Sequence, residues 1–182
     1  DDGGGLYLRE SHATLVNNLV TENQANAAGS GLYIDYSSPH LLHTTIARNS
    51  GGEGSGLYVT GFKEEGGEYY STVALTNTIL VSHTVGIYAT DTSTVTLEST
   101  LWGSEAWANV TDTDGPGAII TGTYNYWDDP AFVDPDAGNY HLSSSSAAID
   151  QGVDAGVAVD IDGQSRPIGE GYDLGADEFP AA

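Results

Sequence analysis

The sequence predicts an all-β fold, a parallel β-solenoid with an irregular C-terminal cap module. The main observation is a repeated motif, Gly-Leu-Tyr-aliphatic, whose tyrosines stand 26, 25 and 30 residues apart along the 182-residue chain. A second apolar segment follows each copy, and the 24 glycines show no collagen period and therefore indicate many turns. Short strands separated by turns, with a period of roughly 20 to 30 residues, are typical of stacked solenoid coils.

The first strand of each predicted coil is the motif itself, at 5–8, 31–34 and 56–59, with a variant at 86–89. Side chains alternate across a strand, so the leucine and the final aliphatic residue point inward and the tyrosine points outward. Equivalent residues of successive coils stack about 4.8 Å apart. We therefore expect an exposed aromatic ladder that consists of Tyr7, Tyr33, Tyr58 and Tyr88.

The second strand of each coil is expected at 15–20, 41–46, 73–79 and 95–101, where apolar residues alternate with polar ones. Alignment of these segments predicts two stacked rows of side chains. The first row is Val16, Leu42, Leu75 and Leu97. The second row is Val20, Ile46, Ile79 and Leu101.

The turns after these strands carry small polar residues. Asn23 and Asn49 end the first two copies, whereas Ser82 and Ser104 stand at the same place in the later copies. An asparagine ladder at this position is expected to satisfy the backbone groups of the turns. The longer step to the third coil indicates an insertion at 62–70, which is expected to be a protruding polar loop.

The chain divides into β-helix coils at 1–125 and a cap or docking module at 126–182, continuous with the solenoid. The module has turns rich in Pro and Asp and few periodic apolar positions. The first coil begins at Gly5 without a polar cap segment, so its strand edge is expected to need cover. Either further sequence precedes it or another chain covers it. In the second case, copies stack head to tail into a filament.

The charge of the chain excludes several classes of partner. Four Lys and Arg residues stand against 26 Asp and Glu residues, which gives a formal net charge of −22. No basic patch can neutralise phosphates, so we expect no nucleic acid and no anionic membrane as partners. No run of about 18 apolar residues is present, which predicts no membrane insertion. The lack of cysteine excludes disulfides and thiolate metal sites.

Several short segments in the C-terminal part of the sequence resemble those of a known family. They lie at 124–127, 129–135, 138–142, 146–152, 160–167 and 173–179. With its coils and these segments, the chain resembles secreted bacterial right-handed parallel β-helix proteins with pectate-lyase-like coils. Its end resembles the terminal module of β-helix proteins on bacterial surfaces. The resemblance implies a right-handed parallel β-helix and an extracellular or bacterial cell-surface location.

Polysaccharide cleavage is the enzymatic activity associated with this resemblance, but the residues favour no catalytic site. Lyases of this kind combine Ca²⁺ with a basic residue near the sugar, and the few basic residues form no cluster in the sequence. They are Arg9, Arg48, Lys63 and Arg166. No carboxylate pair recurs on one face, as a hydrolase would need. His40 and His43 lack further zinc ligands and are expected to be exposed coil residues.

The sequence indicates no certain cofactor, and calcium is the metal that the acidic residues suit best. Three Asp-x-Asp pairs lie in or beside turns, and paired carboxylates supply the hard oxygens that calcium binds. The pairs are Asp112 and Asp114, Asp134 and Asp136, and Asp160 and Asp162. None of them completes an EF-hand, and the alternative is that these residues form turns by accepting backbone N–H bonds. The loop at Asp160 is the preferred candidate.

These observations predict a non-enzymatic extracellular structural protein, a scaffold or adhesive element that stacks head to tail. Its expected partner is a second copy or an extracellular glycan. The alternative is a β-helix protein that binds or cleaves polysaccharide. The tyrosine ladder fits either hypothesis, since exposed aromatic side chains suit both sugars and protein partners. The simpler interpretation is that aromatic stacking only stabilises the coils.

Overall fold

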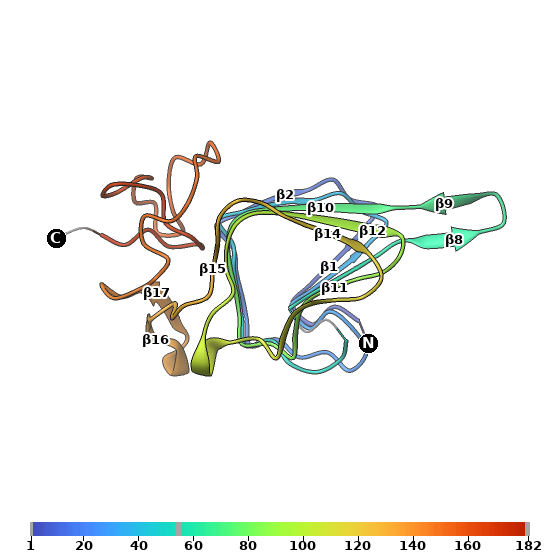
Figure 1. Ribbon diagram of the computed structural model, residues 1–182, viewed down its shortest axis with the longest axis horizontal. Helices are drawn as coiled ribbons and strands as arrows, with labels where there is room; N and C mark the ends of the chain where they lie inside the picture. The colour runs from blue at the N-terminus through green and yellow to red at the C-terminus, as the bar shows by residue number, and fades with distance from the viewer. Residues whose placement is uncertain (1, 54–55, 181–182) are drawn as a thin grey trace.

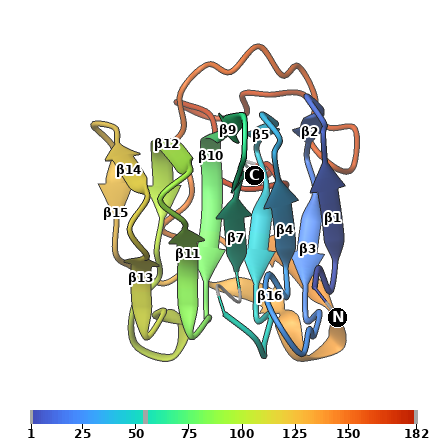
Figure 2. The same ribbon diagram turned by 90° about the vertical axis from the view of Figure 1, so that its right-hand side faces the viewer.

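The computed structural model describes residues 2–53 and 56–180 as an all-β molecule of about five stacked parallel turns (Figure 1). The first sheet contributes one strand per turn, and neighbouring strands run parallel (Figure 2). Its strands in axial order are β1 (Leu6–Arg9), β4 (Leu32–Asp35), β7 (Leu57–Thr60), β11 (Val85–Ala89) and β13 (Thr111–Asp114). The predicted all-β parallel solenoid is confirmed.

The second sheet forms another wall of the same turns. Its main strands are β2 (Thr14–Val16), β5 (His40–Leu42), β10 (Ser71–Val81), β12 (Ser93–Leu101) and β14 (Ala118–Thr121), with β3 (Leu19–Thr21), β6 (Thr45–Ala47) and β15 (Asn125–Tyr126) beside them. Each of the first four turns has a residue with a left-handed backbone in this wall. These residues are Asn17, His43, Asn77 and Ser99, with φ between 49° and 56°. Leu41 before this position and Ile46 after it both reach the core.

Aliphatic side chains fill the space between the two sheets. In the first sheet the motif register is as predicted, because Leu6 pairs with Leu32, and Leu57 pairs with both Leu32 and Ile87. Leu32, Leu57 and Ile87 are fully buried and belong to the same apolar cluster as Leu41. Burial of each such side chain contributes about 1.5–3 kcal/mol to stability.

The register predicted for the second strands is wrong between the second and third turns. Leu75 pairs with Leu41 instead of Leu42, and Ile79 pairs with Thr45 instead of Ile46. A shift of one residue moves a side chain to the opposite face of a strand. The inward row is therefore Leu15, Leu41, Leu75 and Leu97. Because residues 41 and 42 are both leucine, the sequence allows Leu75 to be aligned with either of them. Only the alignment with Leu41 places Leu41 in the core.

The insertion predicted at 62–70 is an antiparallel hairpin that projects from the solenoid (Figure 1). It consists of β8 (Phe62–Glu64) and β9 (Gly67–Tyr69). Two short 3-10 turns, η1 (Glu105–Trp107) and η2 (Pro135–Ala137), are the helical segments in the described part of the chain. No helix in that part is long and apolar enough to cross a membrane.

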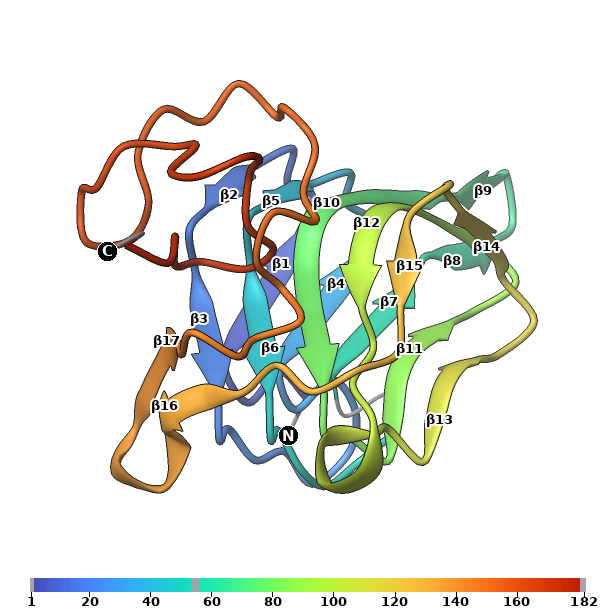
Figure 3. The same cartoon turned by 60° about the vertical axis from the view of Figure 1, so that its left-hand side comes forward.

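The C-terminal module is irregular, as predicted, and it lies along the flank of the solenoid (Figure 3). Its strands β16 (Phe132–Asp134) and β17 (Asn139–Leu142) form an antiparallel pair. An apolar cluster joins the module to the second sheet. Its buried members are Ala47, Ile79, Val81, Leu101, Phe132, Tyr140, Leu142, Ala148 and Leu174.

After this cluster the chain runs back along the solenoid towards its first turn. The Ser99 hydroxyl donates to the Gln151 carbonyl at 3.1 Å, and the Asn77 amide exchanges two hydrogen bonds with the Val153 backbone at 2.7 and 2.8 Å. Farther along, the Asn17 amide donates to the Val159 carbonyl at 2.7 Å. The segment 151–159 thus crosses the turns as a strap, with its contacts at the residues that have left-handed backbones.

Candidate functional site

The tyrosine ladder forms as the sequence predicts. Ring centroids of successive tyrosines lie 5.1 to 5.2 Å apart, and the ring planes differ by 3° to 10°. Tyr7 is 46% exposed, Tyr33, Tyr58 and Tyr88 are half-buried, and Asp114 takes the equivalent place in the fifth turn. Because each inner ring is stacked on both faces, the ladder presents ring edges and hydroxyl groups to solvent.

The two inner tyrosines, Tyr33 and Tyr58, have raised pKa values. Burial and the nearby Asp2 carboxylate raise the pKa of Tyr33 to about 12. Burial and Glu53 raise the pKa of Tyr58 as well. At neutral pH these two hydroxyls are therefore neutral hydrogen-bonding groups on an acidic molecule.

A polar ladder, buried at Asn49 and His83, follows the second sheet, and it extends farther than the predicted asparagines. Asn49 Oδ1 accepts from the backbone N–H of Asn23 at 2.9 Å, and Asn49 Nδ2 lies 3.3 Å from His83 Nε2. Asn109 Oδ1 accepts from the backbone N–H of His83 at 3.0 Å. The ladder positions in the third and fourth turns are therefore His83 and Asn109, and the prediction of Ser82 and Ser104 at these places is wrong.

His83 is held in its neutral form. Asn49 Oδ1 is occupied by Asn23, so Asn49 presents its NH₂ group to His83 Nε2, which must accept. His83 Nδ1 lies 3.1 Å from Asn109 Oδ1 and donates to it. Burial lowers the pKa of His83 to about 4, because a charged imidazole would lose its hydration and would place two donors face to face.

The expectation of two exposed histidines is correct for His40 alone. His43 is fully buried, where its Nε2 lies 2.9 Å from the Asn77 amide, and burial lowers its pKa to about 4. His43 has a left-handed backbone at the bend of the second sheet. Its side chain therefore does not follow the in-and-out alternation expected along a regular strand.

The three candidate calcium pairs lie in different surroundings. Asp112 accepts from the side chains of Asn109 and Trp127, and Asp114 Oδ1 accepts from the backbone N–H of Gly115. Asp134 is exposed, and Asp136 pairs with the guanidinium of Arg48 at 2.7 Å. These four carboxylates belong to no three-ligand group among the described residues.

Asp160, the preferred candidate, has backbone partners for both carboxylate oxygens. Its Oδ1 accepts from Asp162 N at 3.0 Å and Gln164 N at 2.7 Å, and its Oδ2 accepts from Glu178 N at 3.1 Å. The residue is buried. These are the bonds of a turn-forming aspartate, the alternative left open for these residues.

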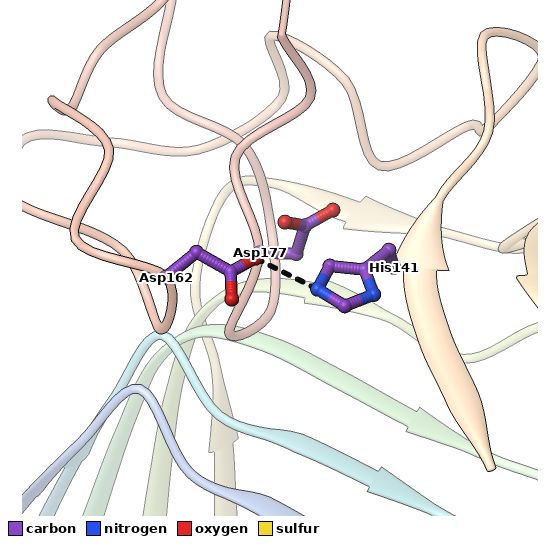
Figure 4. A group of neighbouring side chains, drawn as sticks. All are labelled: His141, Asp162 and Asp177. Atoms are coloured by element: carbon purple, nitrogen blue, oxygen red, sulfur yellow. Dashed lines mark hydrogen bonds and ion pairs between the residues drawn. The ribbon is translucent and has the colours of Figure 1, made fainter.

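A group that could hold a metal does lie next to this loop (Figure 4), in the part of the chain that the structure describes. It consists of His141 in β17, Asp162 and Asp177, and a ligand atom of each lies within 4.8 Å of the others. Only Asp162 was a predicted ligand. No sequence pattern pointed to the other two residues, because the module has no repeat that would bring distant residues into register.

A cleft of about 240 Å³ separates the last turns from the module. Its lining residues are Tyr124, Tyr126, Asp150, Gln151, Gly152 and Val153. Aromatic rings beside carboxylate and amide groups are suited to a polar ligand that also has apolar faces.

The chain matches no family model, and no curated protein and no solved structure matches it. Of the resemblance stated above, the parallel β-solenoid is the part that the structure supports. Bacterial secretion and a pectate-lyase-like origin stay predictions.

Proposed function

We propose that this protein is a non-enzymatic extracellular scaffold whose solenoid turns stack end to end with those of further copies. The observation that carries the proposal is the open edge of the fifth turn. Among the described residues, β13 pairs with β11 alone and β14 pairs with β12 alone, because the C-terminal module covers the flank instead of this end.

The backbone of β13 is oriented to receive another strand. Leu6 and Leu32 hold the same register position as Thr113, and each donates its N–H to the next turn, Leu6 to Gly31 and Leu32 to Gly56, at 3.0 Å. By this equivalence the Thr113 N–H points away from the fourth turn. Unpaired donors along a sheet edge are a template for pairing with another chain.

The other end of the described solenoid offers a complementary surface. There β1 pairs with β4 alone, and Leu6, Leu8 and Leu15 are only half-buried although they pack against the main core. Placing this turn against the fifth turn of a second copy would cover these leucines and Ile119, which is also half-buried. Such a head-to-tail contact does not close on itself, so it produces a filament.

Charge sets the conditions for this association. Each copy has a net charge of −22, so contacts between copies are opposed by electrostatic repulsion at low salt. We expect the assembly to strengthen as ionic strength rises, since the stacking contacts themselves are apolar and backbone-mediated.

Sedimentation velocity over a range of salt and protein concentrations tests the proposal. The Ile120→Lys variant places a positive charge on the edge strand β14 and is expected to shift the protein to monomers, because lysine protects sheet edges. Val133→Lys in β16 is the matched control, since both residues are 54% exposed. A wild-type protein that stays monomeric under all conditions, or equal assembly of the two variants, contradicts the proposal.

Glycan binding is the second candidate function, and the cleft between the last turns and the module favours it. Tyr124 is 47% exposed at this cleft, so it can stack on a sugar while Gln151 and Asp150 offer polar groups. Binding to a panel of extracellular polysaccharides should weaken about tenfold in Tyr124→Ala and remain unchanged in Tyr70→Ala, a comparably exposed tyrosine that does not line the cleft. Equal losses in the two variants would refute a site in the cleft.

A further inference from the structure

Three side chains of the C-terminal module meet at one point although they are far apart in sequence (Figure 4). His141 Nε2 lies 2.7 Å from Asp162 Oδ2, and an oxygen of Asp177 lies within 4.8 Å of a ligand atom of each. About half of the side chain of His141 and of Asp162 is exposed, so an ion can enter from solvent. Asp177 is the buried member of the group.

The Asp177 carboxylate is the observation that points to a ligand. The residue is only 4% exposed, and its Oδ2 accepts from the Leu142 N–H at 2.7 Å. Its Oδ1 is buried and has no hydrogen-bond partner among the described residues. A buried carboxylate oxygen without a partner is costly, and a cation beside it would remove that cost.

The histidine is oriented as metal-binding histidines usually are. Asn139 Oδ1 accepts from the backbone N–H of His141 at 3.1 Å and lies 2.5 Å from His141 Nδ1. Because Asn139 presents an acceptor, Nδ1 must carry the proton. The lone pair of a neutral ring is then on Nε2, which faces Asp162. A second hydrogen bond that fixes the tautomer and the ring orientation is typical of histidine ligands.

The charges around the site favour a divalent ion. The Asp177 carboxyl group feels the negative charges of Asp160 and Asp162 and the opposing charge of His141. A protonated His141 could compensate one carboxylate through its ion pair with Asp162, but it would leave the Asp177 oxygen without a partner. A metal ion satisfies all three side chains together.

We propose that His141, Asp162 and Asp177 bind a divalent transition-metal ion, with Zn²⁺ as the best fit. One imidazole nitrogen and two carboxylate oxygens, with water in the fourth position, make a tetrahedral zinc site. Calcium prefers six to eight oxygen ligands and seldom uses nitrogen, so it fits this group poorly. The site is independent of the end-to-end stacking, because its ligands lie in the module.

The bound ion would hold the module against the solenoid. It would join β17, the loop that contains Asp162, and the segment next to Ala176, whose backbone N–H donates to Thr45 Oγ1 in β6. Saturation with Zn²⁺ is therefore expected to raise the melting temperature of the full chain.

Isothermal titration with ZnCl₂, MnCl₂ and CaCl₂ on metal-stripped protein of all 182 residues tests the proposal. We expect one Zn²⁺ per chain, binding at least about 100-fold more tightly than Ca²⁺. His141→Gln and Asp162→Asn should each weaken zinc binding at least about tenfold, and so should Asn139→Ala through loss of ligand orientation. Both ligand substitutions are at half-exposed positions, so circular dichroism should show an intact fold.

His12→Gln and Asp134→Asn are the matched controls, since both positions are exposed and lie outside the group. They should bind zinc as the wild type does. The proposal is overturned if zinc binds with the same affinity to His141→Gln, if calcium binds as tightly as zinc, or if no saturable zinc binding occurs and His141 and Asp162 form only an ion pair. Replacement of Zn²⁺ by Co²⁺ gives a second readout, because a tetrahedral site with a nitrogen ligand produces a visible absorption band that Asp162→Asn should lose.

Discussion

His83 links the polar ladder to the pH range in which the protein is stable. In the folded chain its pKa is lowered to about 4, whereas an unfolded histidine titrates near 6.5. Above pH 6.5 both states hold neutral imidazole and the group has no effect. As the pH falls from 6.5 to 4, the unfolded state takes up the proton first, so stability is lost, by about 3 kcal/mol at the limit.

The variant His83→Asn tests this effect, because asparagine already occupies the equivalent ladder positions 49 and 109. We expect its free energy of unfolding to fall less between pH 6.5 and 4 than that of the wild type. Urea titrations at several pH values measure the difference. Burial raises the pKa of Asp173 to about 7, so this residue changes the stability with pH in the opposite direction. Because the wild type and the variant share Asp173, its contribution cancels when their free energies of unfolding are compared. Parallel pH profiles would contradict the role assigned to His83.

The ion pair between Arg166 and Glu178 organises the centre of the module. The Nη1 and Oε2 atoms lie 2.5 Å apart, and both side chains are completely buried. Arg166 also donates to the Gly175 carbonyl at 2.9 Å, and Glu178 Oε1 accepts from the Ile168 N–H at 2.8 Å. Burial lowers the pKa of Arg166, although the carboxylate beside it opposes that shift.

Removal of one partner should be costly, since it leaves the other charge buried and uncompensated. We expect Glu178→Gln to reduce the free energy of unfolding by about 3–5 kcal/mol in chemical denaturation. Glu64→Gln on the exposed hairpin serves as the control and should change stability by less than about 0.5 kcal/mol. A small effect of Glu178→Gln would show that the pair does not organise the module.

At the level of the strands, the glycine of the repeated motif is required by the close approach of successive turns. A Cβ at Gly5 would lie 2.7 Å from the carbonyl oxygen of Gly31, and one at Gly86 would lie 2.6 Å from that of Asp112. Gly31 faces the carbonyl of Gly56 in the same way. Each motif therefore starts with the residue that lets the next turn pack against its backbone.

Gly31→Ala should consequently push two turns apart. We expect a loss of about 1–3 kcal/mol in the free energy of unfolding, which is the usual cost of overpacking. Gly67→Ala in the hairpin is the control, because a Cβ there meets nothing closer than 3.6 Å. Thermal denaturation measures the melting temperatures of Gly31→Ala and Gly67→Ala. Equal melting temperatures would rule out the steric explanation.

The sequence predicted the elements that repeat and missed those that do not. The motif tyrosines were placed correctly because their period recurs with one type of residue at each step. His83 was missed because the ladder changes residue type there, and the neighbouring Ser82 resembles the expected turn. His141 and Asp177 were missed because no periodicity relates β17 to the C-terminal segment, so only tertiary packing brings them together.

At the scale of the molecule, the strap formed by 151–159 connects turns that otherwise contact only their neighbours. A solenoid is stabilised mainly by contacts between adjacent repeats, so its end turns open most easily. The strap forms hydrogen bonds with Ser99 in the fourth turn, then with Asn77 in the third turn and finally with Asn17 in the first turn. It therefore connects the fourth turn to the first. It strengthens the solenoid and leaves the ends of the described solenoid free.

The variant Asn77→Gly removes the two side-chain bonds to Val153, together with the contact to His43 Nε2, and keeps the left-handed backbone that glycine readily adopts. We expect amide exchange in 151–159 to accelerate about tenfold or more, since two hydrogen bonds of about 1 kcal/mol each are lost. Ser82→Gly, also at a left-handed residue but without a bond to the strap among the described contacts, should leave this segment protected. Unchanged exchange in Asn77→Gly would mean that other contacts hold the strap.

Electron cryo-microscopy of the wild-type protein at high salt tests the end-to-end stacking most directly. We predict filaments in which β13 of one copy pairs in parallel with β1 of the next, so that the strand spacing of about 4.8 Å continues without a break across the joint. Dispersed single molecules, or particles joined through the module or the tyrosine ladder, would contradict the proposed scaffold.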